Sequence, residues 1–339
     1  MILVTGATGH LGNVLVRTLC AQGERVRALV LPNDACPALA DLDVECVTGN
    51  VLDPASLNAA LRDVELVYHL AGIISIVPSR TDLMWRVNVE GVHNLAQAAL
   101  QSNVRRVVYV SSIHAFKTLP QGTVVDETAP LALAAPPEVY NRTKAEGTVR
   151  MLDAVAQGLD AVIVCPTGII GPHDYLQSEM GLLIRSFAQR RVHVLIDGGY
   201  DFVDVRDVVG GLRQAAQGGE RGELYILSGF NTPLTHMRRI VQELAGIHTP
   251  ALIVPFRLAK AAARLMERLY RWTGSVPRFT AYSLNTVREN VCFSHEKATQ
   301  TFGYHPRPLR ETLTDLLAWY NQREVGLRAP LPGRPSPAR

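Results

Sequence analysis

A tyrosine and a lysine stand four positions apart, at Tyr140 and Lys144, in a stretch with a helical pattern. Residues at this spacing share one helix face, so the two side chains can act together. A phenol with a pKa of about 10 is a poor base at neutral pH, but a neighbouring ammonium stabilises the phenolate and lowers that pKa. We therefore expect Tyr140 to exchange a proton with an alcohol or carbonyl oxygen. Taken alone, the pair also fits an exposed helix that carries both residues by chance.

Two serines, Ser111 and Ser112, directly follow an apolar run over residues 107–110. Ligands of open parallel sheets bind outside the carboxyl ends of the strands. A hydroxyl at that place can hydrogen-bond a reacting oxygen as charge develops on it. Ser112 is our candidate for this role, whereas Ser111 also fits a simple capping serine.

Three glycines, Gly6, Gly9 and Gly12, lie between an apolar strand pattern over residues 1–4 and a helical pattern over residues 11–22. A dinucleotide pyrophosphate needs a tight turn, a backbone without Cβ where the phosphate approaches, and a helix N-terminus aimed at the negative charge. A glycine-rich structural turn is the alternative. The strand before the turn and the helix after it favour nucleotide binding.

The elements that position these residues alternate along the first 170 residues. Strands are expected at residues 1–4, 25–31, 44–47, 65–70, 107–110 and 161–165, with helices at 11–22, 54–61, 85–101 and 140–157. This alternation predicts an α/β fold with a doubly wound parallel sheet (Rossmann), whose strands are buried on both faces.

The pattern loosens after residue 171. We expect a dinucleotide-binding domain over residues 1–171, rejoined by residues 202–228. Residues 172–201 and 229–325 are expected to form a smaller, mostly helical C-terminal substrate lobe, with a strand at 192–196. Within it, residues 256–272 have an amphipathic helical pattern, and the proline-rich residues 326–339 are expected to be a mobile tail.

The glycine spacing TGxxGxxG and the YxxxK pair together resemble the extended short-chain dehydrogenase/reductase superfamily, the NAD-dependent epimerase/dehydratase family. The phrases at residues 26–30, 88–92 and 140–146 resemble its dihydroflavonol reductase-like and 3β-hydroxysteroid dehydrogenase-like branch. The resemblance implies an NAD(P)-dependent enzyme of the extended short-chain type. It implies that Tyr140 is the acid/base, that Lys144 also binds the nicotinamide ribose, and that Ser112 orients the substrate oxygen.

The same resemblance implies a cofactor-binding set that extends beyond the glycine turn. Its members are Gly6, Gly9, His10, Leu11, Gly12, Leu31, Asn50, Val51, Leu70, Ala71, Gly72, Tyr140, Lys144 and Pro166. Asn50 stands where the family usually has Asp, although an amide can also meet the adenine edge. Asn88 resembles the family's asparagine on the long helix, but a simple polar helix residue fits as well.

The choice between NAD and NADP depends on the end of the second strand. An acidic residue there favours NAD through the ribose hydroxyls, and an arginine suits the 2′-phosphate of NADP. This chain has Val30 and Leu31 at these positions, and the missing arginine favours NAD. The directions in which Arg27 and Asp34 point are not determined by the sequence.

Composition excludes several function classes. The net charge is +3, with 34 basic and 31 acidic residues mixed along the chain, so no nucleic-acid partner is expected. The five cysteines form no CxxC pair, so we expect no metal site and no disulfide framework. No apolar run reaches a membrane span, and no targeting peptide is evident. These features predict a cytoplasmic enzyme with a small-molecule substrate, and the family habit suggests a homodimer.

Three functions compete. The first is a dehydrogenase or reductase for an alcohol or ketone on an apolar or ring-containing molecule, with Met84, Trp85, Phe116 and Tyr175 as candidates to line its pocket. The second is a nucleotide-sugar epimerase or dehydratase that recycles bound NAD. It needs a diphosphate site, for which the candidates are Arg185, Arg190 and Arg191. The third, a non-catalytic NAD(P) sensor, has no need of the Ser/Tyr/Lys set.

Overall fold

The fold was analysed in a computed structural model of the chain. It describes residues 1–74, 81–120, 122–134, 139–255, 258–259 and 292–326. Two expectations therefore lie largely or wholly outside the described residues: the amphipathic helix at 256–272 and the mobile tail at 326–339. Across the described parts of the chain, no helix is both long and apolar enough to cross a membrane.

A seven-stranded parallel sheet forms the larger lobe, with the strand order β11-β7-β5-β4-β1-β2-β3. Its strands are β1 (Ile2–Thr5), β2 (Val26–Val30), β3 (Glu45–Thr48), β4 (Leu66–His69), β5 (Arg106–Val110), β7 (Ala161–Pro166) and β11 (Leu224–Leu227). All six neighbour pairs are parallel. The predicted doubly wound sheet is confirmed. Strand order reverses between β1 and β4, so a ligand is expected beyond the carboxyl ends of these two strands.

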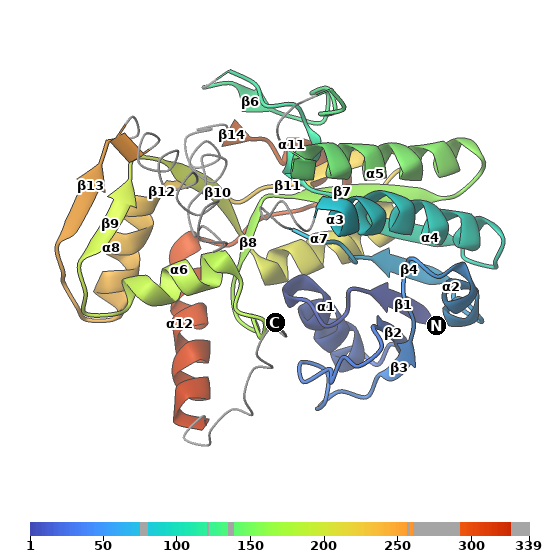
Figure 1. Cartoon of the computed structure of the whole chain (residues 1–339), viewed down its shortest axis with the longest axis horizontal. Coiled ribbons are helices and arrows are strands. Elements are labelled where there is room, and N and C mark those ends of the chain that lie inside the picture. Colours follow the sequence, from blue (N-terminus) through green and yellow to red (C-terminus); the bar gives the residue numbers. More distant parts are fainter. Residues whose placement is uncertain (75–80, 121, 135–138, 256–257, 260–291, 327–339) are drawn as a thin grey trace.

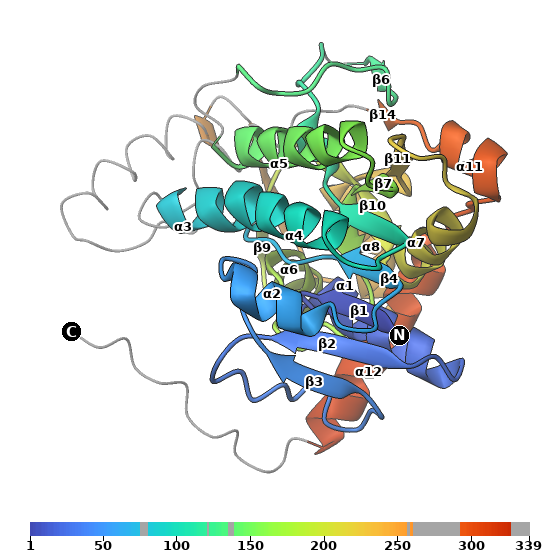
Figure 2. The same ribbon diagram turned by 90° about the vertical axis from the view of Figure 1, so that its right-hand side faces the viewer.

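Helices cover both faces of this sheet, and successive residues of a strand enter different cores. Val4 packs in one apolar cluster with α1 (His10–Ala21), α7 (Val205–Gly218) and α11 (Glu296–Phe302). Leu3 packs in the other, with α2 (Pro54–Ala60), α4 (Gly91–Leu100) and α5 (Val139–Ala156). The helices α4 and α5 lie side by side over that face (Figures 1 and 2). Burial on both faces explains the near-continuous apolar strand sequences.

In the described part of the second lobe, the helices α6 (Glu179–Phe187), α8 (Leu234–Leu244) and α12 (Leu309–Gly326) pack around their own apolar cluster. This lobe also contains two small sheets. One joins β8 (Gly168–Ile170), β10 (Gly199–Asp204) and β12 (Phe230–Pro233), and the other joins β9 (His193–Ile196) to β13 (Ala251–Val254).

One strand expectation was wrong. Residues 202–205 were expected to rejoin the main sheet, but β10 pairs with β8 and β12 in the small sheet. The helix that follows, α7, packs on the main sheet, and β11 pairs with β7 at its edge. An apolar strand sequence is therefore compatible with either sheet, because it indicates that the strand is buried and not which strand it pairs with.

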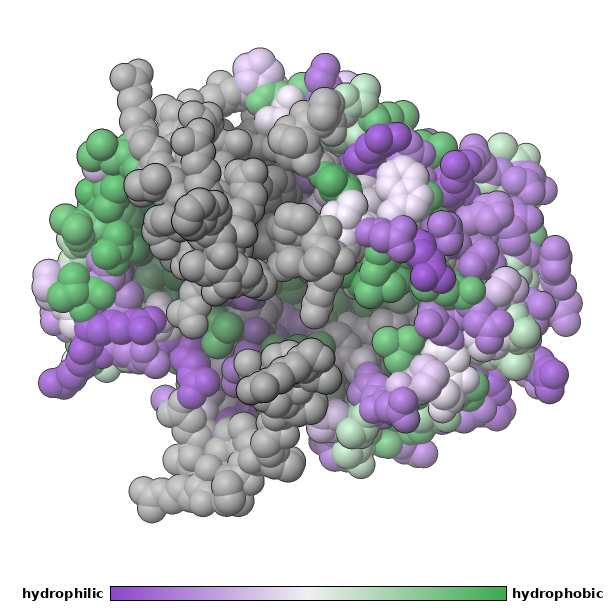
Figure 3. Space-filling model, viewed as in Figure 1, coloured by the Kyte–Doolittle hydropathy of each residue, from purple (hydrophilic) through white to green (hydrophobic). Residues whose placement is uncertain are grey.

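The outer side of the β9–β13 sheet is apolar and exposed. Val194 and Leu252 are partners in the parallel register, and their side chains are 65% and 60% exposed. Apolar side chains gather over these strands at the left of Figure 3, far from β1 and β4 in Figure 1. This surface belongs to the second lobe and does not contribute to the site described below.

Candidate active site

At the glycine turn, the backbone between β1 and α1 lies in close contact with the backbone that follows β4. Gly6 has a φ of +68°, and a Cβ on it would lie 2.7 Å from the backbone nitrogen of Ala71. A Cβ on Gly12 would lie 2.0 Å from the carbonyl oxygen of Gly6. The helix α1 begins at His10, and no side chain caps its N-terminus. Its first N–H groups and the positive end of its dipole therefore suit a dinucleotide pyrophosphate.

Thr5, at the end of β1, joins the turn to the end of β4. Its hydroxyl lies 2.7 Å from Nδ1 of His69 and accepts a hydrogen bond from the backbone N–H of Ala71. Burial, reinforced by the charge of Lys144, lowers the pKa of His69 to about 3, so its ring is neutral. These contacts hold the Leu70–Ala71 backbone against Gly6. Thr5 and His69 were not predicted as site residues from the sequence, although each stands at the end of an expected strand.

Ser112, Tyr140 and Lys144 lie together, and each is less than a tenth exposed. The Ser112 hydroxyl hydrogen-bonds the Tyr140 phenol. Lys144 Nζ donates to the Val110 carbonyl at 3.2 Å. A Cβ on Gly72 would come within 3.4 Å of Lys144 Nζ, so the ammonium reaches the segment that borders the glycine turn. The proton-transfer group and the cofactor turn thus meet at the carboxyl ends of β1, β4 and β5.

The charge state of this group differs from the expectation. Burial raises the pKa of Tyr140 to about 12, and the hydrogen bond from Ser112 only partly opposes it. Burial also lowers the pKa of Lys144 to about 8. The expectation that Lys144 lowers the pKa of Tyr140 is therefore not met here, because desolvation of the phenol outweighs the other effects. At neutral pH, the Tyr140 phenol is therefore protonated.

Ser111 has a structural role. Its hydroxyl lies 2.7 Å from that of Thr148, whose hydroxyl also donates to the Lys144 carbonyl. This chain of bonds ties β5 to α5 beneath the catalytic side chains. Ser111 does not cap a helix: the N-cap of the short 3₁₀ turn Ile113–Ala115 is Ser112, whose hydroxyl accepts from the backbone N–H of His114.

Asn88 fixes the loop after β4 to α5. Its side chain accepts from Ile73 N–H at 2.8 Å and donates to the Ile73 carbonyl and to Thr143. The expected continuous helix at 85–101 is interrupted here, because Asn88 sits in a π-helical turn (Arg86–Glu90) between α3 (Thr81–Trp85) and α4. A Cβ on Gly147 would lie 2.2 Å from the Asn88 carbonyl, so the bulge and α5 are in close contact. Such bulges are frequent at functional sites.

The other expected cofactor residues surround the same edge of the sheet. His10 Nε2 lies 3.0 Å from the Pro172 carbonyl, and Leu11 packs beside it in the first turn of α1. Asn50 uses its side-chain oxygen to accept from the Leu52 N–H, and Val51 is buried against Gly91. Leu31 is 55% exposed just after β2, and Pro166 is the last residue of β7. These residues lie in loops, at strand ends or in the first turn of α1, at the carboxyl edge of the sheet.

Comparison with known proteins agrees with this geometry. The sequence profile described as "NAD dependent epimerase/dehydratase family" matches residues 2–227. The chain belongs to this family. It is 36% identical to sterol demethylase protein B of Methylococcus capsulatus over 95% of this chain and 98% of the relative. It is 27% identical to a 3 beta-hydroxysteroid dehydrogenase/Delta 5→4-isomerase of Mycobacterium tuberculosis, covering 94% and 90% of the two chains.

Among solved structures, this chain resembles the crystal structure of gox2253. The two share 33% identity and a TM-score of 0.84, with 95% of this chain and 98% of the other covered. The resemblance to the extended short-chain dehydrogenase/reductases, in the branch that contains the 3β-hydroxysteroid dehydrogenases, is confirmed. This chain is thus an NAD(P)-dependent enzyme. The close backbone contacts of Gly6 and Gly12 at the glycine turn fit a bound dinucleotide.

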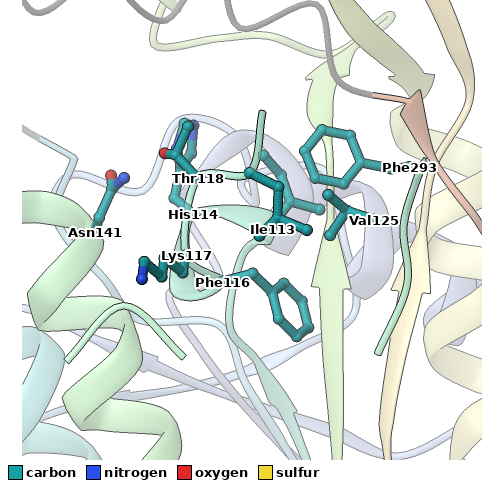
Figure 4. Close-up of a pocket in the computed structure, with 9 residues that line it drawn as sticks. Ile113, His114, Phe116, Lys117, Thr118, Val125, Asn141 and Phe293 are labelled. Atoms are coloured by element: carbon teal, nitrogen blue, oxygen red, sulfur yellow. The ribbon is translucent and has the colours of Figure 1, made fainter. Parts of the chain in front are cut away.

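A small pocket lies among the residues that follow β5, and its lining includes Asn141, the neighbour of Tyr140 in the chain (Figure 4). It is lined by five apolar side chains and four other residues: Ile113, Phe116, Leu119, Val125 and Phe293, then His114, Lys117, Thr118 and Asn141. The His114 ring is 5.5 Å from the Tyr140 ring, and burial lowers the pKa of His114 to about 4. The pocket wall next to the phenol is therefore apolar or uncharged.

Of the four residues expected to line an apolar pocket, Phe116 does so. Tyr175 instead packs edge-on against Trp319 in the second lobe, and Trp85 lies under the Arg142 guanidinium. Met84 is fully buried. Phe293 was missed, because it comes from β14 (Cys292–Phe293), which pairs with β6 (Val124–Val125). A pairing between segments so far apart has no local signal.

Proposed function

We propose that this enzyme transfers a hydride between a nicotinamide cofactor and an alcohol or ketone on an apolar, ring-containing small molecule. Tyr140 is the acid/base of this reaction. The observation that supports the proposal is the small pocket whose lining includes five apolar side chains and also His114, the ring of which lies 5.5 Å from that of Tyr140. The names of the relatives, a sterol demethylase protein and a 3β-hydroxysteroid dehydrogenase, support a steroid-like substrate.

The side chains divide the work by position. The bound cofactor supplies or accepts the hydride at the substrate carbon. In the reducing direction, Tyr140 donates its proton to the carbonyl oxygen, and in the oxidising direction its phenolate takes the proton back. Ser112 donates a hydrogen bond to the same oxygen and stabilises the charge that develops there. Lys144 would hold the nicotinamide ribose, while Asn88 positions the loop after β4 and α5.

The nucleotide-sugar alternative finds less support. It requires cations that converge on a diphosphate, but Arg185 lies over the Tyr320 ring at 5.8 Å, and Arg190 and Arg191 are exposed beyond the end of α6. The solved nucleotide-sugar enzymes that resemble this chain are 25% identical or less and mostly share the fold alone. Net redox chemistry on an apolar molecule is the better reading.

The proposal is tested with a 3β-hydroxysteroid and NAD, following absorbance at 340 nm, and with UDP-glucose in parallel. Before the assay, denatured protein is analysed by mass spectrometry for retained nucleotide. We expect steroid-dependent NADH formation and no conversion of UDP-glucose. Tightly retained NAD together with epimerised sugar would replace the proposal with the epimerase reading.

Two further proposals come from the sequence alone. We propose that the enzyme is cytoplasmic and that it forms a homodimer through α4 and α5. Light scattering after size-exclusion chromatography measures the molar mass and so tests the dimer. A monomer at micromolar concentration would contradict the dimer and leave the proposed chemistry untouched.

A further inference from the structure

The loop after β2 places a carboxylate on the glycine turn. Asp34 Oδ2 accepts a hydrogen bond from the Thr8 hydroxyl at 2.8 Å. Thr8 lies between Gly6 and Gly9, in the turn whose backbone suits the pyrophosphate. The two residues are 26 positions apart, so only the fold brings them together.

The loop holds this carboxylate by its own backbone. Asp34 Oδ1 accepts from the backbone N–H of Cys36 at 2.9 Å, and the Asp34 N–H donates to the Leu31 carbonyl. Asn33 and Cys36 both have left-handed φ angles, of 67° and 48°. Non-glycine residues seldom adopt this conformation, and here the two lie on either side of Asp34 in the loop that carries it to the turn.

The positions at the end of β2 that usually distinguish NAD from NADP are occupied by apolar residues in this chain. Val30 ends β2 and is buried, and Leu31 is 55% exposed. Neither can accept a hydrogen bond from a ribose hydroxyl or bind a phosphate through its side chain. Discrimination between a ribose hydroxyl and a 2′-phosphate therefore requires a residue elsewhere.

The flanking arginines are already engaged. Arg17, on α1, makes two hydrogen bonds to the carboxylate of Asp41 and a third to the Ala38 carbonyl. Arg27, on β2, makes two bonds to Glu45 and others to backbone carbonyls near the end of α2. A 2′-phosphate beside Asp34 would meet its carboxylate, because the Arg17 guanidinium is already paired with Asp41 and Arg27 lies at the other end of β2, paired with Glu45.

We propose that Asp34 is the residue that selects NAD over NADP in this enzyme, replacing the acid that other dinucleotide-binding folds carry at the strand end. Its carboxylate has lone pairs beyond those used by Thr8 and Cys36, and these accept from the adenosine ribose hydroxyls. The same negative charge repels the 2′-phosphate. The inference rests on the cofactor site at the glycine turn.

The test is a pair of binding titrations on full-length protein stripped of nucleotide, with NADH and NADPH followed by their fluorescence. For the wild type we expect NADH to bind at least about tenfold more tightly than NADPH, a ratio equivalent to a single unfavourable charge contact. In Asp34→Asn, the preference should fall to about threefold or less, mainly because NADPH binds more tightly. Asp34→Ser removes the same charge in a smaller side chain and should give the same direction.

The matched control is Asp43→Asn. Asp43 is exposed in the same loop and lies outside the contacts to Thr8 and Cys36, so its loss removes an equal charge from the loop. An unchanged preference in Asp43→Asn supports a local role for Asp34, and an equal loss of preference would overturn it. Wild-type protein that binds NADPH as tightly as NADH would also overturn it. If the wild type bound neither, the cofactor site itself would be wrong.

Discussion

The cofactor side and the substrate side of this enzyme are built in different ways. At the glycine turn, Gly12 lies against the backbone of Gly6, and Gly6 lies against the backbone of Ala71, just after the adjacent strand β4. The pocket beside Tyr140 takes Phe116 from the loop after β5 and Phe293 from the far end of the chain. The comparison shows that a site made by backbone geometry can be contained in a short motif, whereas a site made by side-chain shape requires distant segments to meet.

Four substitutions test this contrast, beginning with Tyr140, where the cofactor side and the substrate side meet.

Tyr140→Phe should have the largest effect. It removes the proton donor and acceptor, and we expect kcat with a 3β-hydroxysteroid to fall by about 10²–10⁴-fold. The phenyl ring retains the packing, so the affinity for NADH, measured by fluorescence titration, should change little. Turnover close to that of the wild type would contradict the assigned role of Tyr140.

Gly12→Ala should damage the cofactor side selectively. Its Cβ would lie 2.0 Å from the Gly6 carbonyl, so the turn must shift. We expect the free energy of unfolding to fall by about 1–3 kcal/mol and NADH to bind roughly 100-fold more weakly, as is typical of a misplaced binding group. Gly210→Ala is the control, since nothing lies within 4 Å of its added Cβ. Equal losses in both variants would contradict the special role of the turn.

Lys144 should leave a pH signature on stability. Its pKa is lowered by burial to about 8 from an ordinary value of 10.5. The unfolded chain thus binds more protons between these two values, and the lysine's unfavourable contribution disappears as the pH rises through that window. Lys144→Met lacks this titration. Its stability advantage over the wild type should shrink by about 2 kcal/mol between pH 8 and pH 10, as measured by urea unfolding. A difference that stays constant with pH would contradict the buried, shifted lysine.

Phe293→Ala should have the smallest effect and be confined to the substrate side. Loss of one apolar wall should raise KM for a steroid by about tenfold, while kcat and the affinity for NADH stay unchanged. Phe230→Ala is a matched control, because Phe230 is 42% exposed on β12 and does not line the pocket. If Phe293→Ala weakened NADH binding as strongly as Gly12→Ala, the separation of the two sides would be lost.

The sequence by itself determined the parallel sheet, the glycine turn and the grouping of Ser112, Tyr140 and Lys144 by their positions on strand ends and one helix face. These are local patterns: burial on both faces gives continuous apolar strands, and residues four apart share a helix face. The placement of β10 in the small sheet, the π-helical turn at Asn88 and the pairing of β6 with β14 followed from the tertiary structure alone.

Tertiary packing also decided the chemistry of individual groups. The phenol of Tyr140 was expected to become more acidic beside Lys144, yet its pKa is raised because the folded chain removes water from around it. Likewise, Asp34 lies 26 residues from Thr8 and meets it only because β2 returns beside β1. Sequence patterns report periodicity and burial over a few residues. Which distant group faces which, and how much water remains between them, is decided when the strands and helices pack.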